Sequence, residues 1–140
     1  MDTLTPAQRS ERMRRVRQAG TEPELIVRRA LRALGYRYRL HRRDLPGSPD
    51  IVLPSRRKVI FVHGCFWHAH AGCRRATTPK SNADYWVAKL AENRERDARA
   101  RAALEAAGWT VGVVWECETS DPRRMTGRLD EFILCSRSMA

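Results

Sequence analysis

The chain has 140 residues, a length that fits one domain able to bury about two thirds of its unfolded surface. Lys and Arg number 27 against 16 Asp and Glu, which gives a formal net charge of +11 at pH 7. Most of the excess is arginine, whose planar guanidinium matches phosphate oxygens, so nucleic acid is the leading candidate partner; a basic protein without such a partner is the alternative. The chain has no apolar run long enough to cross a membrane and no signal-peptide core, so we expect a cytoplasmic protein.

The first part of the chain is predicted to be a basic N-terminal arm, residues 1–20, ahead of one domain over residues 21–140. Within the arm, arginines surround only two sizeable apolar residues, Met13 and Val16. Such a segment has little to bury. It is either a solvated helix with frayed ends or an arm that becomes ordered on nucleic acid.

A helix is predicted to follow Thr21 and to end at Gly35. Thr21 and Glu24 have the spacing of a capping box, and Gly35 comes after the last apolar position. In this interpretation the cap alone explains Glu24. Alternation of apolar and basic side chains from Tyr36 to His41 then predicts a half-buried strand.

A short loop with two prolines, residues 45–50, places Asp50 at the start of a second predicted strand. Residues 54–57 indicate a hairpin turn into a third strand, residues 58–62. An aspartate that opens one strand of a hairpin can share a cation with ligands on its partner strand. Capping of a turn is the alternative role for Asp50.

Two further helices and one strand complete the predicted α/β domain. A long helix is expected from Ser81 to about residue 107, before Gly108. One face of this helix carries Trp86, Leu90, Asn93 and Asp97. Residues 109–115 have no polar alternation, as expected of a central strand covered on both faces. A last helix is predicted to begin at Pro122.

Residues 59–73 are the most unusual part of the chain. An apolar run ends at Gly64, and histidines, cysteines and the adjacent aromatics Phe66 and Trp67 crowd together around that point. Packing alone does not ask for this mixture. A strand that delivers metal ligands and imidazoles at its carboxyl end, where α/β proteins gather their active sites, is the simplest interpretation.

Zinc takes four tetrahedral ligands from cysteine and histidine, and this loop offers three of them: Cys65, His70 and Cys73. Cys117 can close the site, because it follows the strand 109–115 at its carboxyl end. A closed site of this kind has no open position for a substrate, so we interpret it as structural. On spacing alone His68 could take the place of His70, and reduced cysteines without a metal are the alternative.

Several motifs together resemble the very short patch repair endonucleases. They are Leu45-Pro-Gly-Ser-Pro-Asp50, Phe61-Val-His-Gly-Cys-Phe-Trp-His68, Thr78-Pro-Lys-Ser-Asn82, Asn93-x-Glu-Arg-Asp97 and Val114-Trp-Glu-Cys117. The resemblance covers nearly the whole chain in order. It implies a restriction-endonuclease-like fold and Mg²⁺-dependent cleavage of the DNA strand 5′ to the thymine of a T:G mismatch, the mismatch left by deamination of 5-methylcytosine.

The resemblance also assigns roles to individual residues. Asp50 is the expected Mg²⁺ ligand, with the main-chain carbonyl of Val62 beside it. The expected groups for acid–base catalysis are His63, His68 and Glu24, and the residues that match the family's zinc ligands are Cys65, His70, Cys73 and Cys117. An aromatic wedge that enters the duplex beside the mismatch is matched by Phe66, Trp67 and Trp86. Further expected DNA contacts are Met13, Arg14 and Arg15 of the arm.

The usual nuclease pattern Asp-x(n)-Glu-x-Lys is absent, and Val62 and His63 stand where Glu and Lys would be. A histidine must therefore handle the attacking water, which suits an imidazole pKa near neutrality. We expect a monomeric Mg²⁺-dependent endonuclease with a structural Zn²⁺, nucleoid-associated when on DNA, with mismatch-repair proteins as further candidate partners. The alternatives are a non-catalytic zinc module that binds damaged DNA and another nuclease of the same fold.

Overall fold

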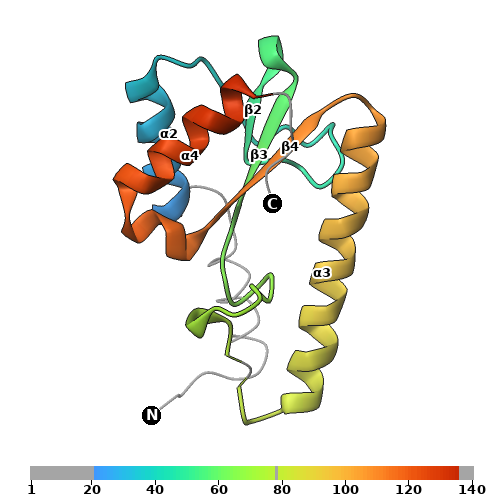
Figure 1. Ribbon diagram of the computed structural model, residues 1–140. Helices are drawn as coiled ribbons and strands as arrows, with labels where there is room; N and C mark the ends of the chain where they lie inside the picture. Colours follow the sequence, from blue (N-terminus) through green and yellow to red (C-terminus); the bar gives the residue numbers. More distant parts are fainter. Residues whose placement is uncertain (1–20, 78, 136–140) are drawn as a thin grey trace.

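The structure is a computed structural model that describes residues 21–77 and 79–135, and it has a mixed sheet between helices (Figure 1). The strands are β1 (Arg39–Leu40), β2 (Ile51–Leu53), β3 (Lys58–His63) and β4 (Thr110–Trp115), in the order β1-β2-β3-β4. The first three strands pair antiparallel, and β3 pairs parallel with β4. The helices are α2 (Glu22–Leu34), α3 (Ala83–Ala106) and α4 (Pro122–Leu134). The expected α/β architecture with a mixed sheet is confirmed.

The sheet lies between two layers of helices. Helices α2 and α4 cover one face, and α3 runs along the other (Figure 1). Successive residues of the hairpin strands alternate between the two resulting cores, as the pleat requires. Ile51 and Ile60 pack with α2 and α4, whereas Val52 and Val59 pack with Leu104 of α3.

The hairpin that carries Asp50 forms as predicted. A 3-10 turn over Pro54–Arg56 leads to Arg57, which has a left-handed backbone with φ of 53°. Strand β3 starts at the next residue and pairs with β2 in the register Ile51 to Ile60. Asp50 therefore stands immediately before β2, beside the carboxyl end of β3.

The N-terminal half of the described chain departs from expectation in two places. The Thr21 side chain makes no hydrogen bond to the start of α2, so the predicted capping box is wrong. Glu24 instead points inward, where His41 and Arg28 hold its carboxylate. The predicted strand is reduced to β1, because Tyr36 packs on the core and donates its hydroxyl proton to Asp130 at 2.8 Å.

Strand β4 is covered on both faces, as predicted, but it is not central. It is the last strand of the sheet formed by residues 21–77 and 79–135. Its inner residues are nevertheless buried, because α4 packs on one face and α3 on the other. The helices α3 and α4 lie where the sequence indicated, with Gly108 at φ of 91° just after α3.

The basic arm, with Met13, Arg14 and Arg15, lies outside the described residues. Within the described part of the chain, none of the helices combines the length and apolar character that a membrane crossing requires.

Helix α4 approaches the sheet most closely at Gly112 of β4. A Cβ atom at this position would lie 2.8 Å from the ring of Phe132, closer than non-bonded carbons pack. The absence of a side chain at Gly112 therefore sets the distance between α4 and β4. Gly127, in the middle of α4, has no atom within 4 Å of the corresponding point.

We predict that Gly112→Ala lowers the free energy of unfolding by about 1–3 kcal/mol, because the Phe132 ring must move in a packed core. Gly127→Ala is the matched control and should raise stability by about 0.5–1 kcal/mol, since Ala is the better helix former. Urea unfolding measures both. Equal effects of the two substitutions would contradict the close approach at Gly112.

Candidate active site and metal centre

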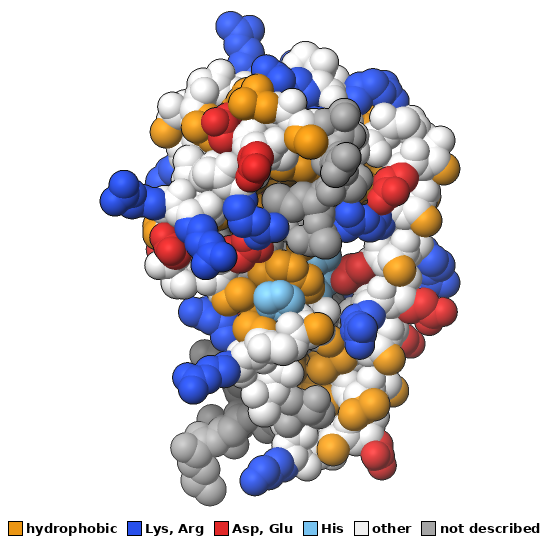
Figure 2. Space-filling view, in the orientation of Figure 1, with side chains coloured by type: hydrophobic (Ala, Val, Ile, Leu, Met, Phe, Trp, Pro, Cys, Tyr) orange, Lys and Arg blue, Asp and Glu red, His pale blue; other side chains and the backbone are white. Residues whose placement is uncertain are grey.

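The polar residues singled out from the sequence gather at one edge of the sheet. Strands β3 and β4 run parallel, so their carboxyl ends meet there, and the antiparallel hairpin brings the start of β2 to the same place. In the middle of the molecular face shown in Figure 2, histidine is exposed at the surface between hydrophobic side chains. Three groups form, in each of which one ligand atom per residue lies within 4.8 Å of the others. They are Cys65, His70, Cys73 and Cys117; His63, His68 and Asp97; and Glu24, His41 and Asp50.

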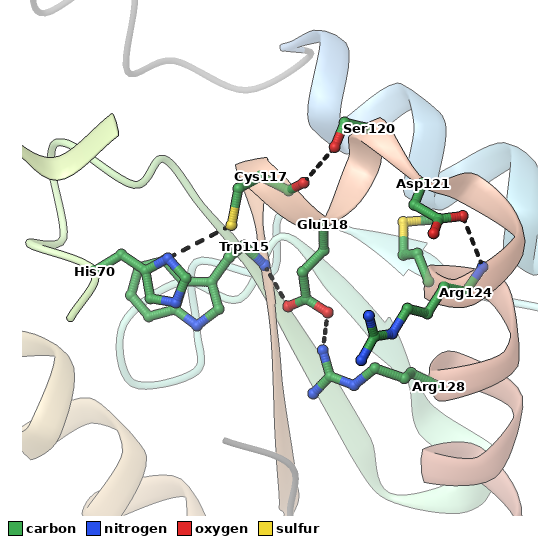
Figure 3. Close-up of a pocket in the computed structure, with 9 residues that line it drawn as sticks. His70, Trp115, Cys117, Glu118, Ser120, Asp121, Arg124 and Arg128 are labelled. Carbon is green, nitrogen blue, oxygen red and sulfur yellow. Dashed lines mark hydrogen bonds and ion pairs between the residues drawn. The ribbon is translucent and has the colours of Figure 1, made fainter. Parts of the chain in front are cut away.

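The first group joins the loops that follow β3 and β4. The His70 amide donates to the Cys65 carbonyl at 2.9 Å, and the Cys73 amide donates to the His70 carbonyl at 3.3 Å. Cys117 lies with its Sγ atom 3.6 Å from His70 Nδ1, and the His70 ring stacks on Trp115 at 3.9 Å between centroids (Figure 3). The structure thus brings together the four residues predicted as one site, with His70 and not His68 among them.

This group fits a metal ion. Three sulfurs and one imidazole nitrogen are a donor set for a soft cation in tetrahedral coordination. All four cysteines are free of disulfide bonds. Burial raises the pKa of the Cys65 thiol, so a thiolate there needs a positive charge close by, which a metal ion supplies. Four protein donors would fill a tetrahedral coordination sphere and leave no position for a substrate, which suits a structural role. Cys135 is exposed and stands apart from the group.

Asp50 is held by the backbone of the neighbouring strand. Its Oδ2 atom accepts the Val62 N–H at 2.7 Å. The pKa of Asp50 is raised to about 6. Desolvation is the main cause, the hydrogen bond from Val62 opposes it, and the nearby charge of Glu24 acts in the same direction as desolvation. A carboxylate whose negative charge is this costly gains from a hard cation, for which oxygen is the preferred ligand. A ligand role for the Val62 carbonyl stays a prediction.

Glu24 belongs to the same group as Asp50. Its side chain is only 3% exposed, and its two oxygens have different partners. Oε1 lies 2.9 Å from His41 Nε2, and Oε2 forms an ion pair with Arg28. His41 in turn donates its amide to the Asp50 carbonyl at 3.0 Å. Tertiary contacts, and not helix capping, therefore explain why Glu24 is buried.

The second group is a pair of stacked imidazoles with a carboxylate. The rings of His63 and His68 lie 3.8 Å apart between centroids and are nearly parallel, at 2°. His68 Nδ1 is 2.5 Å from Asp97 Oδ2 on α3. A carboxylate on Nδ1 fixes the ring orientation and leaves Nε2 to accept a proton, the arrangement of a general base with its orienting partner.

The two imidazoles differ in their environment. The pKa of His63 is lowered to about 3, chiefly because the ring is buried and to a smaller extent because His68 is close. His63 therefore stays neutral near pH 7, and in the described part of the chain its buried Nδ1 atom has no hydrogen-bond partner. Such an orphaned nitrogen is suited to a water molecule or a substrate oxygen. His68 Nδ1 is in direct contact with the Asp97 carboxylate, whereas the His63 ring has no such contact among the described residues.

The predicted aromatic wedge residues also lie together. Phe66 is 5.0 Å from Trp67 and 5.3 Å from Trp86 between ring centroids, and the two tryptophans are 5.9 Å apart. All three side chains are half-buried. Asn93 of α3, which the sequence left without a role, donates to the Trp67 carbonyl at 2.8 Å and so fastens the loop to the helix.

Sequence reasoning missed His41 and Arg28. His41 looked like one more basic residue in an alternating strand, yet it has a left-handed backbone with φ of 48° and touches Glu24. A backbone of this kind outside glycine indicates that the surroundings hold the residue in place. The structure gives the reason: His41 directly follows β1, which is the antiparallel neighbour of β2, the strand that Asp50 precedes.

The fold and the site together define the class of protein. Carboxylates and imidazoles grouped at one sheet edge, beside a Cys/His cluster, give a small α/β protein the acid–base groups of a hydrolase.

Comparisons with known proteins agree with this class. The family profile described as DNA mismatch endonuclease Vsr matches residues 1–75. The chain is 57% identical to the type II nicking enzyme V.XorIIP of Xanthomonas oryzae pv. oryzae, over 94% of this chain and 96% of that one. It is 37% identical to the DNA mismatch endonuclease Vsr of Escherichia coli, over 94% of this chain and 87% of that one. The chain belongs to the Vsr family of DNA mismatch endonucleases, and it is therefore a DNA endonuclease, a hydrolase of DNA repair.

The raised pKa of Asp50 gives a prediction for stability in buffer without magnesium. The folded protein holds this proton more tightly than the unfolded chain, whose Asp has a pKa near its ordinary 3.8. The stability contributed by Asp50 is therefore fully present below about pH 4 and is lost as the pH rises through about 6. Above pH 6 the buried charge costs about 3 kcal/mol, from about two pKa units.

Asp50→Asn has nearly the same shape without the charge. We predict that this variant is more stable than the wild type at pH 8 and about equally stable at pH 4, in urea unfolding without magnesium. Other titrating groups are common to both proteins, so the difference isolates Asp50. Parallel pH profiles for the two proteins would contradict the burial of this charge.

Proposed function

We propose that this endonuclease nicks duplex DNA 5′ to the thymine of a T:G mismatch, on a restriction-endonuclease-like fold. In this proposal Asp50 and the Val62 carbonyl hold a catalytic Mg²⁺. A structural Zn²⁺ is bound by Cys65, His70, Cys73 and Cys117. The family relationship supports the mismatch and the strand, and the names of the relatives agree with nicking.

One observation carries the catalytic part of the proposal. The half-buried Asp50 carboxylate accepts the Val62 N–H at the carboxyl end of β3, and the stacked pair of His63 and His68 begins one residue further on. A non-catalytic DNA-binding module would need neither a carboxylate with a raised pKa nor an imidazole oriented by Asp97. Perturbed groups of this kind are typical of active sites.

The acid–base roles follow from the different surroundings of the two imidazoles. His68 Nε2 takes the proton of the attacking water, and Asp97 on Nδ1 stabilises the imidazolium that forms. His63 stays neutral, and its Nδ1 atom can accept a hydrogen bond from a water molecule or, in the tautomer with the proton on Nδ1, donate to a phosphate oxygen. Two imidazolium rings in contact at 3.8 Å would repel each other, so at most one ring of the pair is positively charged at a time.

The hard cation supplies charge stabilisation at the phosphate, the part of hydrolysis that imidazoles cannot provide. Asp50 and the Val62 carbonyl are the groups of this chain that would hold it. Glu24 stands beside Asp50 with its charge divided between His41 and Arg28, and it completes the polar shell on that side.

The three clustered aromatics support recognition by insertion into the duplex. Unstacking a base step costs a few kcal/mol and is least costly at a mispair, so a wedge selects for the mismatch. Phe66 and Trp67 come from the metal-binding loop and Trp86 from the first turn of α3. The cysteine cluster and the Asn93 bond to Trp67 hold that loop in place.

A nicking assay on a duplex with one labelled T:G mismatch tests the proposed function. We predict Mg²⁺-dependent cleavage of the thymine strand only, immediately 5′ to the mismatched thymine, and no product from the matched T:A duplex. Asp50→Ala should lower the single-turnover rate by at least about 10²-fold, as expected when a metal ligand is removed. Binding without product, or equal cutting of both duplexes, would contradict the proposal.

The two nearby histidines should separate into a catalytic and a structural residue. We predict that His68→Ala lowers the nicking rate by about 10²- to 10⁴-fold and keeps one zinc per chain. His70→Ala should lose zinc and folded stability together, because the binding energy of a structural metal is largely folding energy. Metal content and circular dichroism measure this.

Two cysteines serve as the matched controls for the metal site. Cys117→Ser should behave like His70→Ala, and Cys135→Ser should behave like the wild type. Zinc release by His68→Ala combined with retention by His70→Ala would reverse the assignment of the two histidines.

A further inference from the structure

The molecule has a strongly basic hollow whose lining includes no residue of the cysteine cluster. It has a volume of about 660 Å³ and is lined by the C-terminal half of α2, the segment of residues 36–40 and the turn after β2. Four arginines contribute to its lining, and they are Arg28, Arg32, Arg37 and Arg39. None of the described residues that line it is acidic. We call the cavity lined by these residues the basic hollow.

A second hollow of the molecule differs from the basic hollow because acidic residues are part of its lining. It lies beside His70 and also contains arginines, but its own acidic residues compensate them (Figure 3). Glu118 forms an ion pair with Arg128, and Asp121 accepts the amide of Arg124 at 3.3 Å. The positive charge of that hollow is largely balanced from within. In the basic hollow it is not.

The arginines of the basic hollow have donors to spare. Arg37 and Arg39 are exposed and make no ion pair within residues 21–77 and 79–135. Arg32 donates to the Tyr38 hydroxyl at 3.2 Å, which orients its guanidinium and leaves the hydroxyl proton available. The Nε atom of Arg28 is buried without a hydrogen-bond partner in the described structure. A guanidinium carries five donors, so several remain for an anion with more than one oxygen.

One side chain connects the basic hollow to the active site. Arg28 lines the hollow and pairs with Glu24, whose other oxygen binds His41 beside Asp50. An anion in the hollow and a phosphate at Asp50 would therefore stand on opposite sides of the Arg28–Glu24 pair.

We propose that the basic hollow binds a backbone phosphate of the DNA close to the phosphate that is cut, and so sets the position of the strand in the active site. The inference rests on the proposed function, because it places DNA at Asp50. The hollow is far larger than a phosphate ion, and Leu40 and Pro54 add apolar walls against which a sugar can pack. Phosphate contacts of this kind fix the register of a protein on its duplex without reading sequence.

The test is a scan of T:G duplexes in which one phosphate at a time is replaced by an uncharged methylphosphonate. Binding is measured without magnesium, so that no cleavage is needed. One or two positions near the cleavage site should weaken binding of the wild type by about eightfold at 0.1 M salt. The binding constant loses about this factor for each phosphate contact when the salt concentration rises from about 0.1 M to about 1 M.

Arg32→Gln combined with Arg39→Gln should remove the sensitivity at those positions and leave the rest of the scan unchanged. The slope of log K against log salt should also become shallower by about 1 for each phosphate that the variant no longer binds. The matched control is Arg29→Gln combined with Arg123→Gln, which removes the same charge from exposed positions on α2 and α4 outside the hollow. It should keep the wild-type scan.

The outcomes are distinct. Identical scans for the wild type and the hollow variant would overturn the proposal, as would an equal drop in sensitivity in the control. If the hollow variant does not fold, Arg37→Gln takes its place, because this side chain is exposed and forms no ion pair with the other described residues. If the wild type binds the T:G duplex but does not nick it, the proposed function is refuted, and the methylphosphonate scan can still be interpreted. A wild type that nicks while the scan fails would refute the hollow alone.

Discussion

The parallel pairing of β3 with β4 is the constraint on which the rest of the site depends. Parallel strands end at the same edge of a sheet, so the loops that follow His63 and Trp115 must meet. Cys65 and Cys117 come together for this reason, although they are 52 positions apart in the chain. The antiparallel hairpin then adds Asp50, because the strand that Asp50 opens begins where β3 ends. Two pairings of opposite sense thus bring the cysteine cluster and the carboxylate and imidazole groups to one place.

Local patterns predicted most of the fold and the members of the cysteine cluster. Helical periodicity, turn residues and ligand spacing act over a few residues, which is the range that a single sequence displays. Glu24 shows the limit of this reasoning. Its spacing from Thr21 imitates a capping box, but the energy of its burial comes from Arg28 and from His41, which belongs to another element. A contact of this kind depends on how the elements pack, so the sequence could not distinguish it from a cap.

In the proposed mechanism, a histidine stands where the usual nuclease pattern carries a lysine. A lysine would place a permanent charge beside the carboxylates of Asp50 and Glu24. An imidazole can be neutral, and His68 differs from its stacked partner His63 in its direct contact with Asp97 of α3. In this proposal that contact directs the proton of the attacking water to His68. Burial completes the distinction, since it lowers the pKa of His63 to about 3.

Helix α3 touches the site at three points along one face: Trp86 makes edge-to-face contacts with the loop aromatics, Asn93 holds the Trp67 carbonyl, and Asp97 binds His68. These positions span about 16 Å of helix axis at about 1.5 Å per residue. An α-helix transmits displacement along its length like a rod, so Trp86 cannot shift along the axis without moving Asp97. In the proposed mechanism, a misfit at the aromatic end would therefore reach His68 as a change in its geometry. Fidelity towards substrate would then arise from the stiffness of a single helix.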